Sequence, residues 1–244
     1  MHDSFRSVSR RAPWRALFAL ALLGAAPVAN ASGLGGGTVE GEPAVADCSR
    51  PAALRIQSHY ESVRDLRARF QQETRSATLG AMGGVDLRAG GEVIFAKPGR
   101  MRWSYETPEP SLVVSDNETV WVYDPAAAEA QKLPLGPGFM SGAAIQFLLG
   151  EGDLLADFEI SAVDCAERPL RLSLVPRRDA TYERLEVSAD PDTGEVSETV
   201  VIDLLGNRTR IALSDVRINT DPEPSLFQFV PPAGVRVLEA LPAP

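Results

Sequence analysis

The sequence predicts a mainly β protein in which about eleven short strands form one antiparallel sheet, with two helical segments packed against it. Apolar and polar residues alternate along many short segments after residue 65, which is the period of half-buried strands. Turn-forming dipeptides such as Asp116-Asn117 and Gly206-Asn207 separate these segments. Strands and helices do not alternate regularly, so a parallel sheet is not expected. A sheet of this width is expected to curl strongly or to close.

The N-terminal segment, residues 1–31, has the pattern of a secretory signal peptide. Four arginines precede an apolar run over residues 16–26, and the small-residue triplet Ala29-Asn30-Ala31 follows. The alternative, a membrane anchor, needs ~20 apolar residues, whereas about a dozen are present before Pro27. We therefore expect cleavage after Ala31 and a flexible leader over residues 32–49.

The chain is acidic, with a formal net charge of −9. Without residues 1–31, 20 basic and 32 acidic side chains remain, which gives a formal charge of −12. A protein of this charge repels phosphate backbones, so we expect no nucleic-acid partner. It is also poorly suited to staying on anionic membrane surfaces. We expect one domain over residues 50–240.

Two cysteines, Cys48 and Cys165, are present in the whole chain. Neither lies directly after the expected cleavage site, so we expect a soluble product without a lipid-modified N-terminal cysteine. Export leads to a compartment that permits disulfides, and an exported chain with two cysteines favours a Cys48–Cys165 bridge. Two separate buried thiols are the alternative.

The first predicted element is an amphipathic helix over residues 50–65. Its apolar residues recur at helical spacing at Leu54, Ile56, Tyr60 and Val63. The period then changes to two, which predicts a strand over residues 66–75. Residues 79–90, with Gly91 just beyond them, are rich in glycine and are predicted to form a loop between strands.

Ten further strands are predicted along the remaining chain, in two groups. A dense apolar segment at residues 139–155 lies between the groups and is predicted to form a short helix or a pair of turns. The ten strands are expected at residues 92–96, 101–105, 111–115, 120–123, 131–133, 158–163, 170–175, 185–189, 196–202 and 208–216.

Motifs for catalysis are missing from the sequence. Residues 32–244 contain one histidine, His59, which we expect at the surface of the first helix. There is no nucleophile elbow, no phosphate-binding glycine loop and no His/Cys cluster with metal-ligand spacing. We expect no catalytic residue, metal or cofactor, and no enzymatic activity. A hydrolase that uses two carboxylates is the remaining enzymatic alternative. The apolar residues fit either an ordinary core or a cavity for an apolar ligand, and periodicity leaves both open.

Four segments carry a resemblance to a known family. They are Leu66-Arg-Ala-Arg-Phe-Gln-Gln-Glu-Thr, Gly91-Glu-Val-Ile-Phe-Ala-Lys-Pro-Gly-Arg-Met-Arg-Trp-Ser-Tyr, Val114-Ser-Asp-Asn-Glu-Thr-Val-Trp-Val-Tyr-Asp-Pro and Phe227-Gln-Phe-Val-Pro-Pro-Ala-Gly-Val. In order and spacing the chain resembles the periplasmic outer-membrane lipoprotein carriers of the LolA family, from about Leu54 to Val237. It departs from them at Asn117, where the family usually has glycine, although asparagine tolerates the same left-handed backbone. The glycine-rich insert and the cysteine pair are further departures.

The resemblance implies an unclosed antiparallel half-barrel of about eleven strands with an α-helical lid. It implies a monomeric periplasmic carrier that holds the acyl chains of triacylated lipoproteins in an apolar cavity. The implied partners are an ATP-driven transporter in the inner membrane and either an outer-membrane receptor or the outer membrane itself. A lipid- or lipoprotein-binding sensor or receptor domain on the same scaffold is the alternative.

The resemblance also suggests roles for individual residues. Lys97 is expected to bond carbonyls of the lid helix and to act as a latch, and Met101 is expected near the cavity rim. We expect the sheet wall of the cavity to comprise Phe95, Met101, Trp103, Val113 and Trp121. The lid is expected to contribute Ile145, Phe147, Leu148 and Leu149.

Overall fold

The computed structural model describes residues 47–78, 86–134, 152–163 and 165–239, which belong to one compact unit, Gly41–Pro244. The predicted signal peptide and all but the last residues of the predicted leader lie outside these residues. None of the helices in the described ranges has the length and hydropathy needed to cross a membrane.

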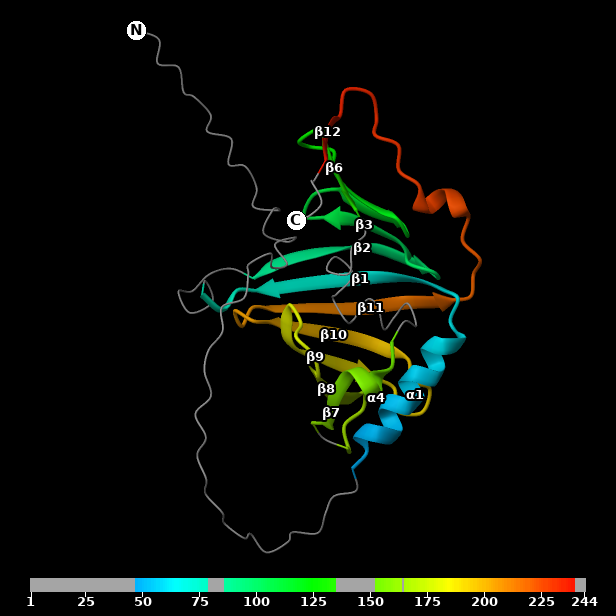
Figure 1. The fold of residues 1–244 in the computed structure, drawn as a ribbon, viewed down its shortest axis with the longest axis vertical. Coiled ribbons are helices and arrows are strands. Elements are labelled where there is room, and N and C mark those ends of the chain that lie inside the picture. Colours follow the sequence, from blue (N-terminus) through cyan, green and yellow to red (C-terminus); the bar gives the residue numbers. More distant parts are fainter. Residues whose placement is uncertain (1–46, 79–85, 135–151, 164, 240–244) are drawn as a thin grey trace, which may run out of the picture. The chain divides into compact units, whose positions relative to one another are not determined.

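One sheet dominates the structure (Figure 1). Its order is β12-β6-β5-β4-β3-β2-β1-β11-β10-β9-β8-β7, so β12 and β7 form its two edges and the sheet is not closed. The mainly β, unclosed and largely antiparallel architecture predicted above is thereby confirmed. The strands are β1 (Asp65–Arg75), β2 (Leu87–Ala96), β3 (Arg100–Thr107), β4 (Ser111–Asp116), β5 (Thr119–Asp124), β6 (Glu129–Pro134), β7 (Phe158–Ala162), β8 (Leu170–Pro176), β9 (Tyr182–Ala189), β10 (Val196–Asp203), β11 (Arg208–Ile218) and β12 (Arg236–Glu239).

The first helix, α1 (Ser49–Ser62), packs by one apolar stripe. The stripe consists of Ala52, Ala53, Ile56 and Tyr60, all buried. The Tyr60 hydroxyl accepts a hydrogen bond from the backbone N–H of Val196 on β10 at 3.1 Å, and burial raises the pKa of Tyr60 to about 12. The predicted helix, residues 50–65, runs too far, because the backbone at Val63 is already extended and β1 begins at Asp65.

A second helix, α4 (Leu154–Asp157), is a single turn that contacts α1 and β7. Asp153 caps its N-terminus by accepting hydrogen bonds from the backbone N–H groups of Leu155 and Ala156. α4 lies at the end of the predicted apolar segment, residues 139–155, most of which is outside the described residues.

The turn at Asn117 follows the expected conformation. Asn117 has a φ of 84°, the left-handed region in which asparagine is tolerated. It joins β4 to β5 in the tight turn that Asp116-Asn117 predicts.

Gly90 and Gly91 belong to β2, although the glycine-rich segment predicts a loop there. The pairing of β2 with β3 shifts register between these two glycines. A Cβ on Gly91 would lie 1.9 Å from the carbonyl oxygen of Ser104, so the neighbouring backbone leaves no room for a side chain. The glycines therefore mark an irregular strand pair and not the end of a strand.

The C-terminal segment runs from β11, in the middle of the sheet, to the edge formed by β12. It contains a 3₁₀ turn, η2 (Pro224–Phe227), and then β12, which pairs with β6 in parallel. The sequence predicted neither a strand after residue 216 nor a parallel pair, so the prediction for this segment is wrong. A connection of this length can carry the chain around to run parallel, whereas a tight hairpin cannot.

Candidate functional site

The register of the strands divides the sheet into two chemically different faces. Directly paired residues of neighbouring strands point to the same face. Phe70 of β1 is opposite Gly91 of β2, which is opposite Tyr105 of β3. We call the face that carries Phe70 the inner face. Its large apolar residues include Leu66, Phe70, Val93, Phe95, Met101, Trp103, Val113, Val120, Val122, Leu172, Leu174, Leu185 and Val187.

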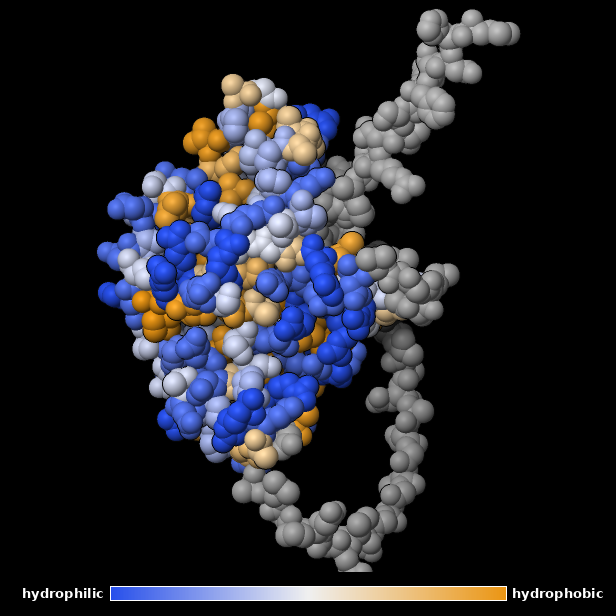
Figure 2. Space-filling model, turned by 180° about the vertical axis from the view of Figure 1, so that it is seen from behind, coloured by the Kyte–Doolittle hydropathy of each residue, from blue (hydrophilic) through white to orange (hydrophobic). Residues whose placement is uncertain are grey.

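Most of the inner face carries no charged side chain; the exceptions include Asp124 on β5 and Glu129 on β6, which are paired with each other in the strand register and buried. No charged side chain lies on the inner face of β1, β2, β3, β4 or β8. The same holds for the inner-face positions of residues 185–189, 199–201 and 209–213. The outer face instead carries ion pairs, such as Arg67–Glu92 at 2.8 Å and Arg69–Glu106 at 2.6 Å. Seen from behind relative to Figure 1, the molecule shows a mostly hydrophilic surface (Figure 2). The two faces therefore differ as the walls of an apolar site and a solvated exterior should.

Four aromatic rings form the centre of the inner face. Phe70 meets Trp103 edge-on with ring centroids 4.7 Å apart, and it meets Tyr105 at 5.1 Å. Phe95 contacts Trp103 at 5.7 Å, also edge-on. Rings fixed in this way present a rigid apolar surface at small entropic cost, because each has two side-chain torsions.

The structure brings four of the five predicted wall residues together. Phe95, Met101, Trp103 and Val113 are inner-face residues, and each is at most 7% exposed. The prediction for Trp121 is wrong. Trp121 pairs with Val114, whose side chain points away from that of Val113, and it contacts Phe229 on the outer face at 5.5 Å. A period of two fixes which residues of a strand share a face, but not how β5 is aligned with β4.

The four predicted lid residues, Ile145, Phe147, Leu148 and Leu149, lie outside the described residues.

Lys97 contacts the end of α1. Its ammonium group donates hydrogen bonds to the carbonyl oxygens of Tyr60, at 2.7 Å, and Glu61, at 3.5 Å. The last carbonyls of a helix have no partner within the helix and carry partial negative charge, which a cation stabilises. The Lys97 backbone N–H also donates a hydrogen bond to the carbonyl oxygen of Arg64, two residues after the end of α1, at 2.9 Å. Lys97 thus ties the C-terminal end of α1 to the β2–β3 turn.

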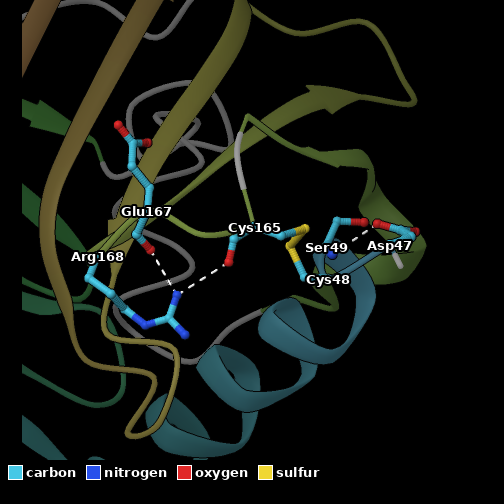
Figure 3. Close-up of a disulfide and its surroundings, with 6 residues drawn as sticks. All are labelled: Asp47, Cys48, Ser49, Cys165, Glu167 and Arg168. Atoms are coloured by element: carbon cyan, nitrogen blue, oxygen red, sulfur yellow. Dashed lines mark hydrogen bonds between the residues drawn. A yellow bond between two sulfur atoms is a disulfide. The ribbon is translucent and has the colours of Figure 1, made fainter. Parts of the chain in front are cut away.

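The other end of α1 is tied covalently. A disulfide joins Cys48, directly before α1, to Cys165, which follows β7, with the two Cα atoms 5.8 Å apart (Figure 3). The Arg168 guanidinium donates to the carbonyl oxygens of Cys165, at 3.3 Å, and Glu167, at 2.9 Å, which shapes the loop that presents Cys165. α1 is therefore held at both ends. The disulfide holds its N-terminal end covalently, and the hydrogen bonds of Lys97, which can exchange with water, hold its C-terminal end.

Comparison with known proteins decides the family. The family model described as outer membrane lipoprotein carrier protein LolA matches residues 61–230, more than half of the chain. The chain belongs to the LolA family. A relative called outer-membrane lipoprotein carrier protein from Alkalilimnicola ehrlichii is 31% identical over 76% of this chain and 82% of its own. One of the same name from Methylococcus capsulatus is 31% identical over 76% of this chain and 86% of its own.

Among solved structures, an uncharacterized conserved protein from Thermus thermophilus aligns with a TM-score of 0.48 at 13% identity, covering 78% of this chain and 98% of that one. The family assignment rests on the family model and the sequence relatives.

In this LolA family member, sequence reasoning missed several inner-face residues. Phe70, Gln72 and Tyr105 belong to the inner face together with Leu172 and Leu185 on the other half of the sheet. The alternation within residues 66–75 and 101–105 was a sufficient signal for the first three. The leucines of β8 alternate with polar residues as well, but alternation does not show that they share a face with the aromatic strands, because that depends on the sheet order.

Proposed function

We propose that this protein is a carrier that shields the acyl chains of lipoproteins against the inner face of its sheet. Family membership supports the proposal, and the observation that carries it is the largely uncharged, aromatic inner face described above. Each CH₂ group left in water costs ~0.8 kcal/mol, so an acylated protein needs such a surface to travel through an aqueous compartment. The nucleotide-dependent work of extracting cargo would belong to a membrane partner.

The proposed route runs through the periplasm. The carrier receives triacylated lipoproteins from an ATP-driven transporter in the inner membrane and delivers them to an outer-membrane receptor or to the outer membrane itself. The signal-peptide pattern of residues 1–31 supports export. Fractionation of the producing cells tests this: the protein is expected in the soluble periplasmic fraction, and retention in the inner membrane would contradict the route.

Access to the inner face is proposed to depend on α1. Lys97 holds the C-terminal end of this helix by hydrogen bonds, which can exchange with water, whereas the disulfide holds the other end. Loading would then involve release of the Lys97 end, with α1 turning about Cys48. In this proposal Lys97 is a latch on α1.

Displacement of a hydrophobic fluorophore tests the proposed cargo. The purified protein is expected to bind the fluorophore, and a triacylated lipoprotein is expected to displace it. The matched control is the same lipoprotein without its acyl chains, which is expected to displace none. Equal displacement by both forms, or by neither, would rule out acyl-chain binding. Mass spectrometry of material that copurifies from the periplasm would then identify the natural cargo.

A further inference from the structure

The inner face changes character along its strands. Near α1 it carries Leu66 on β1, Phe95 on β2 and Met101 on β3. Toward the other end of the sheet, polar side chains appear among the apolar ones. We call Tyr105, Gln72, Thr74 and Thr209 the polar row, since they come from the adjacent region of β3, β1 and β11 and share the inner face.

The polar row is linked by hydrogen bonds that become longer along its length. The Tyr105 hydroxyl donates to the Gln72 side-chain oxygen at 3.1 Å, and the Gln72 amide donates to the Thr74 hydroxyl at 3.4 Å. The Thr74 and Thr209 hydroxyls are 3.5 Å apart. Bonds of 3.4 to 3.5 Å are weak, and an amide and two hydroxyls can form further or replacement bonds.

The surroundings of the polar row are apolar and uncharged. Gln72 is 6% exposed and stands one inner-face position beyond Phe70. Tyr105 contacts Phe70 with its ring and Gln72 with its hydroxyl, so it joins the aromatic cluster to the row. Burying an amide beside aromatic rings is costly unless it is hydrogen-bonded. Gln72 is directly paired with Ala89 and Ile211, so polar side chains from three strands meet here beside apolar neighbours.

The dimensions fit a lipid with its chains toward α1. Gln72 is six residues from Leu66 along β1, which is about 20 Å at the rise of a strand. The acyl layer of one leaflet is about 15 Å thick, half of the hydrocarbon core. A chain of that length whose end lies at Leu66 would therefore bring its carbonyl group between Phe70 and Gln72, toward the Gln72 amide. Because the row has no charged side chain, it suits neutral carbonyl oxygens better than a carboxylate or phosphate.

We propose that the polar row is a subsite for the ester and amide carbonyl groups of the acylated lipid, which fixes the direction in which the lipid lies on the inner face. The proposal rests on the proposed carrier function and adds to it a specificity for acyl esters over plain hydrocarbon. The Gln72 amide and the threonine hydroxyls would donate to the lipid carbonyls, replacing the two long bonds of the row. Tyr105 would keep Gln72 in place.

The test compares two synthetic lipopeptides that have the same peptide and the same chain length. One carries two acyl esters, and the other carries two alkyl ethers, which lack the carbonyl acceptors. The exported protein is expected to bind the ester three- to tenfold more tightly, the worth of about one net hydrogen bond. Equal binding of both would overturn the polar row and leave the carrier function standing. Binding of neither would overturn the carrier function itself.

Two variants test whether the preference for the ester lipopeptide comes from the polar row. Gln72→Met keeps the length of the side chain and removes the amide, so the ratio of ester affinity to ether affinity is expected to fall to about one. Ser115→Ala is the matched control, because Ser115 is also a buried polar residue of the inner face but lies beside Met101, near the α1 end. It is expected to retain the full preference. A preference that survives in Gln72→Met, or in Tyr105→Phe should the first variant fail to fold, would refute the assignment.

Discussion

At the scale of single residues, the two tryptophans of the described sheet are the sharpest contrast between its faces. Trp103 is 7% exposed in the aromatic cluster of the inner face, whereas Trp121 lies on the outer face against Phe229. Trp103→Leu is expected to weaken binding of the hydrophobic fluorophore about five- to tenfold, since it removes an apolar contact worth on the order of 1 kcal/mol. Trp121→Leu should leave binding within a factor of two. Fluorescence titration checks both, and the opposite ranking would reverse the assignment of the faces.

Lys97 offers a second test, because the chain contains one other lysine. Lys132 lies over the Trp121 ring at 5.7 Å on the outer face, so Lys132→Leu is a matched control for Lys97→Leu. Removing the Lys97 ammonium leaves the Tyr60 carbonyl without its charged partner. Bound fluorophore is expected to exchange several-fold faster in Lys97→Leu and at the normal rate in Lys132→Leu. Stopped-flow exchange measures this, and equal rates in all three proteins would remove Lys97 as a latch.

At the scale of elements, the C-terminal segment contacts a motif that lies more than a hundred residues earlier in the sequence. Phe227 is 1% exposed against Ile94 and Ala96 of β2. The Arg100 guanidinium lies over its ring at 5.1 Å, and Arg102 donates to the Leu226 carbonyl oxygen at 3.0 Å. Arg100 and Arg102 thus bind the C-terminal segment on the outer face. Met101 and Trp103, which alternate with them along β3, face inward.

Phe227→Ala is expected to destabilise the protein by ~3–4 kcal/mol, since it empties a packed site beneath a guanidinium. Val230→Ala, three residues later, is the control, because Val230 is 83% exposed and its loss should change stability by less than ~0.5 kcal/mol. Urea unfolding followed by circular dichroism measures both. If Phe227→Ala unfolded at the urea concentration of the parent protein, the C-terminal segment would not stabilise the sheet.

The disulfide acts on α1 as an element. Cys48 and Cys165 are 117 residues apart in sequence, so the bridge constrains a long loop of the unfolded chain. Replacing both by serine is expected to cost ~2–5 kcal/mol of unfolding free energy. Hydrogen exchange should also rise more in the first turns of α1 than in its Lys97 end. Faster exchange confined to the Lys97 end would contradict the proposed pivot at Cys48.

The fold was predictable to different depths in different elements. Alternation at residues 66–75 and 101–105 defined β1 and β3 and their apolar faces, because each strand has one buried face. The same rule failed at Trp121 because a one-residue difference in alignment exchanges the faces. It failed at Gly90-Gly91 because glycine marks both turns and close backbone approaches. β12 was missed because its four residues are all exposed and show no period.

At the scale of the whole molecule, the concentration of ion pairs on the outer face should appear in the pH dependence of stability. Hydrogen bonds from Arg67, Arg69 and Arg75 hold the pKa values of Glu92, Glu106 and Asp86 below their usual values of 4.5, 4.5 and 3.8. Because folding lowers these pKa values, their contribution is complete above pH 4.5 and is lost as the pH falls through the lowered values. The Tm is therefore expected to stay nearly constant from pH 7 to 5.5 and to fall below pH 4.5. The fall should be gradual, since the pairs are largely exposed.

The double variant Arg67→Gln/Glu92→Gln, which removes one pair, should show a shallower fall when thermal unfolding is followed by circular dichroism across this range. A Tm that rises below pH 4.5 would show that relief of acidic repulsion, and not the loss of these pairs, controls stability in acid.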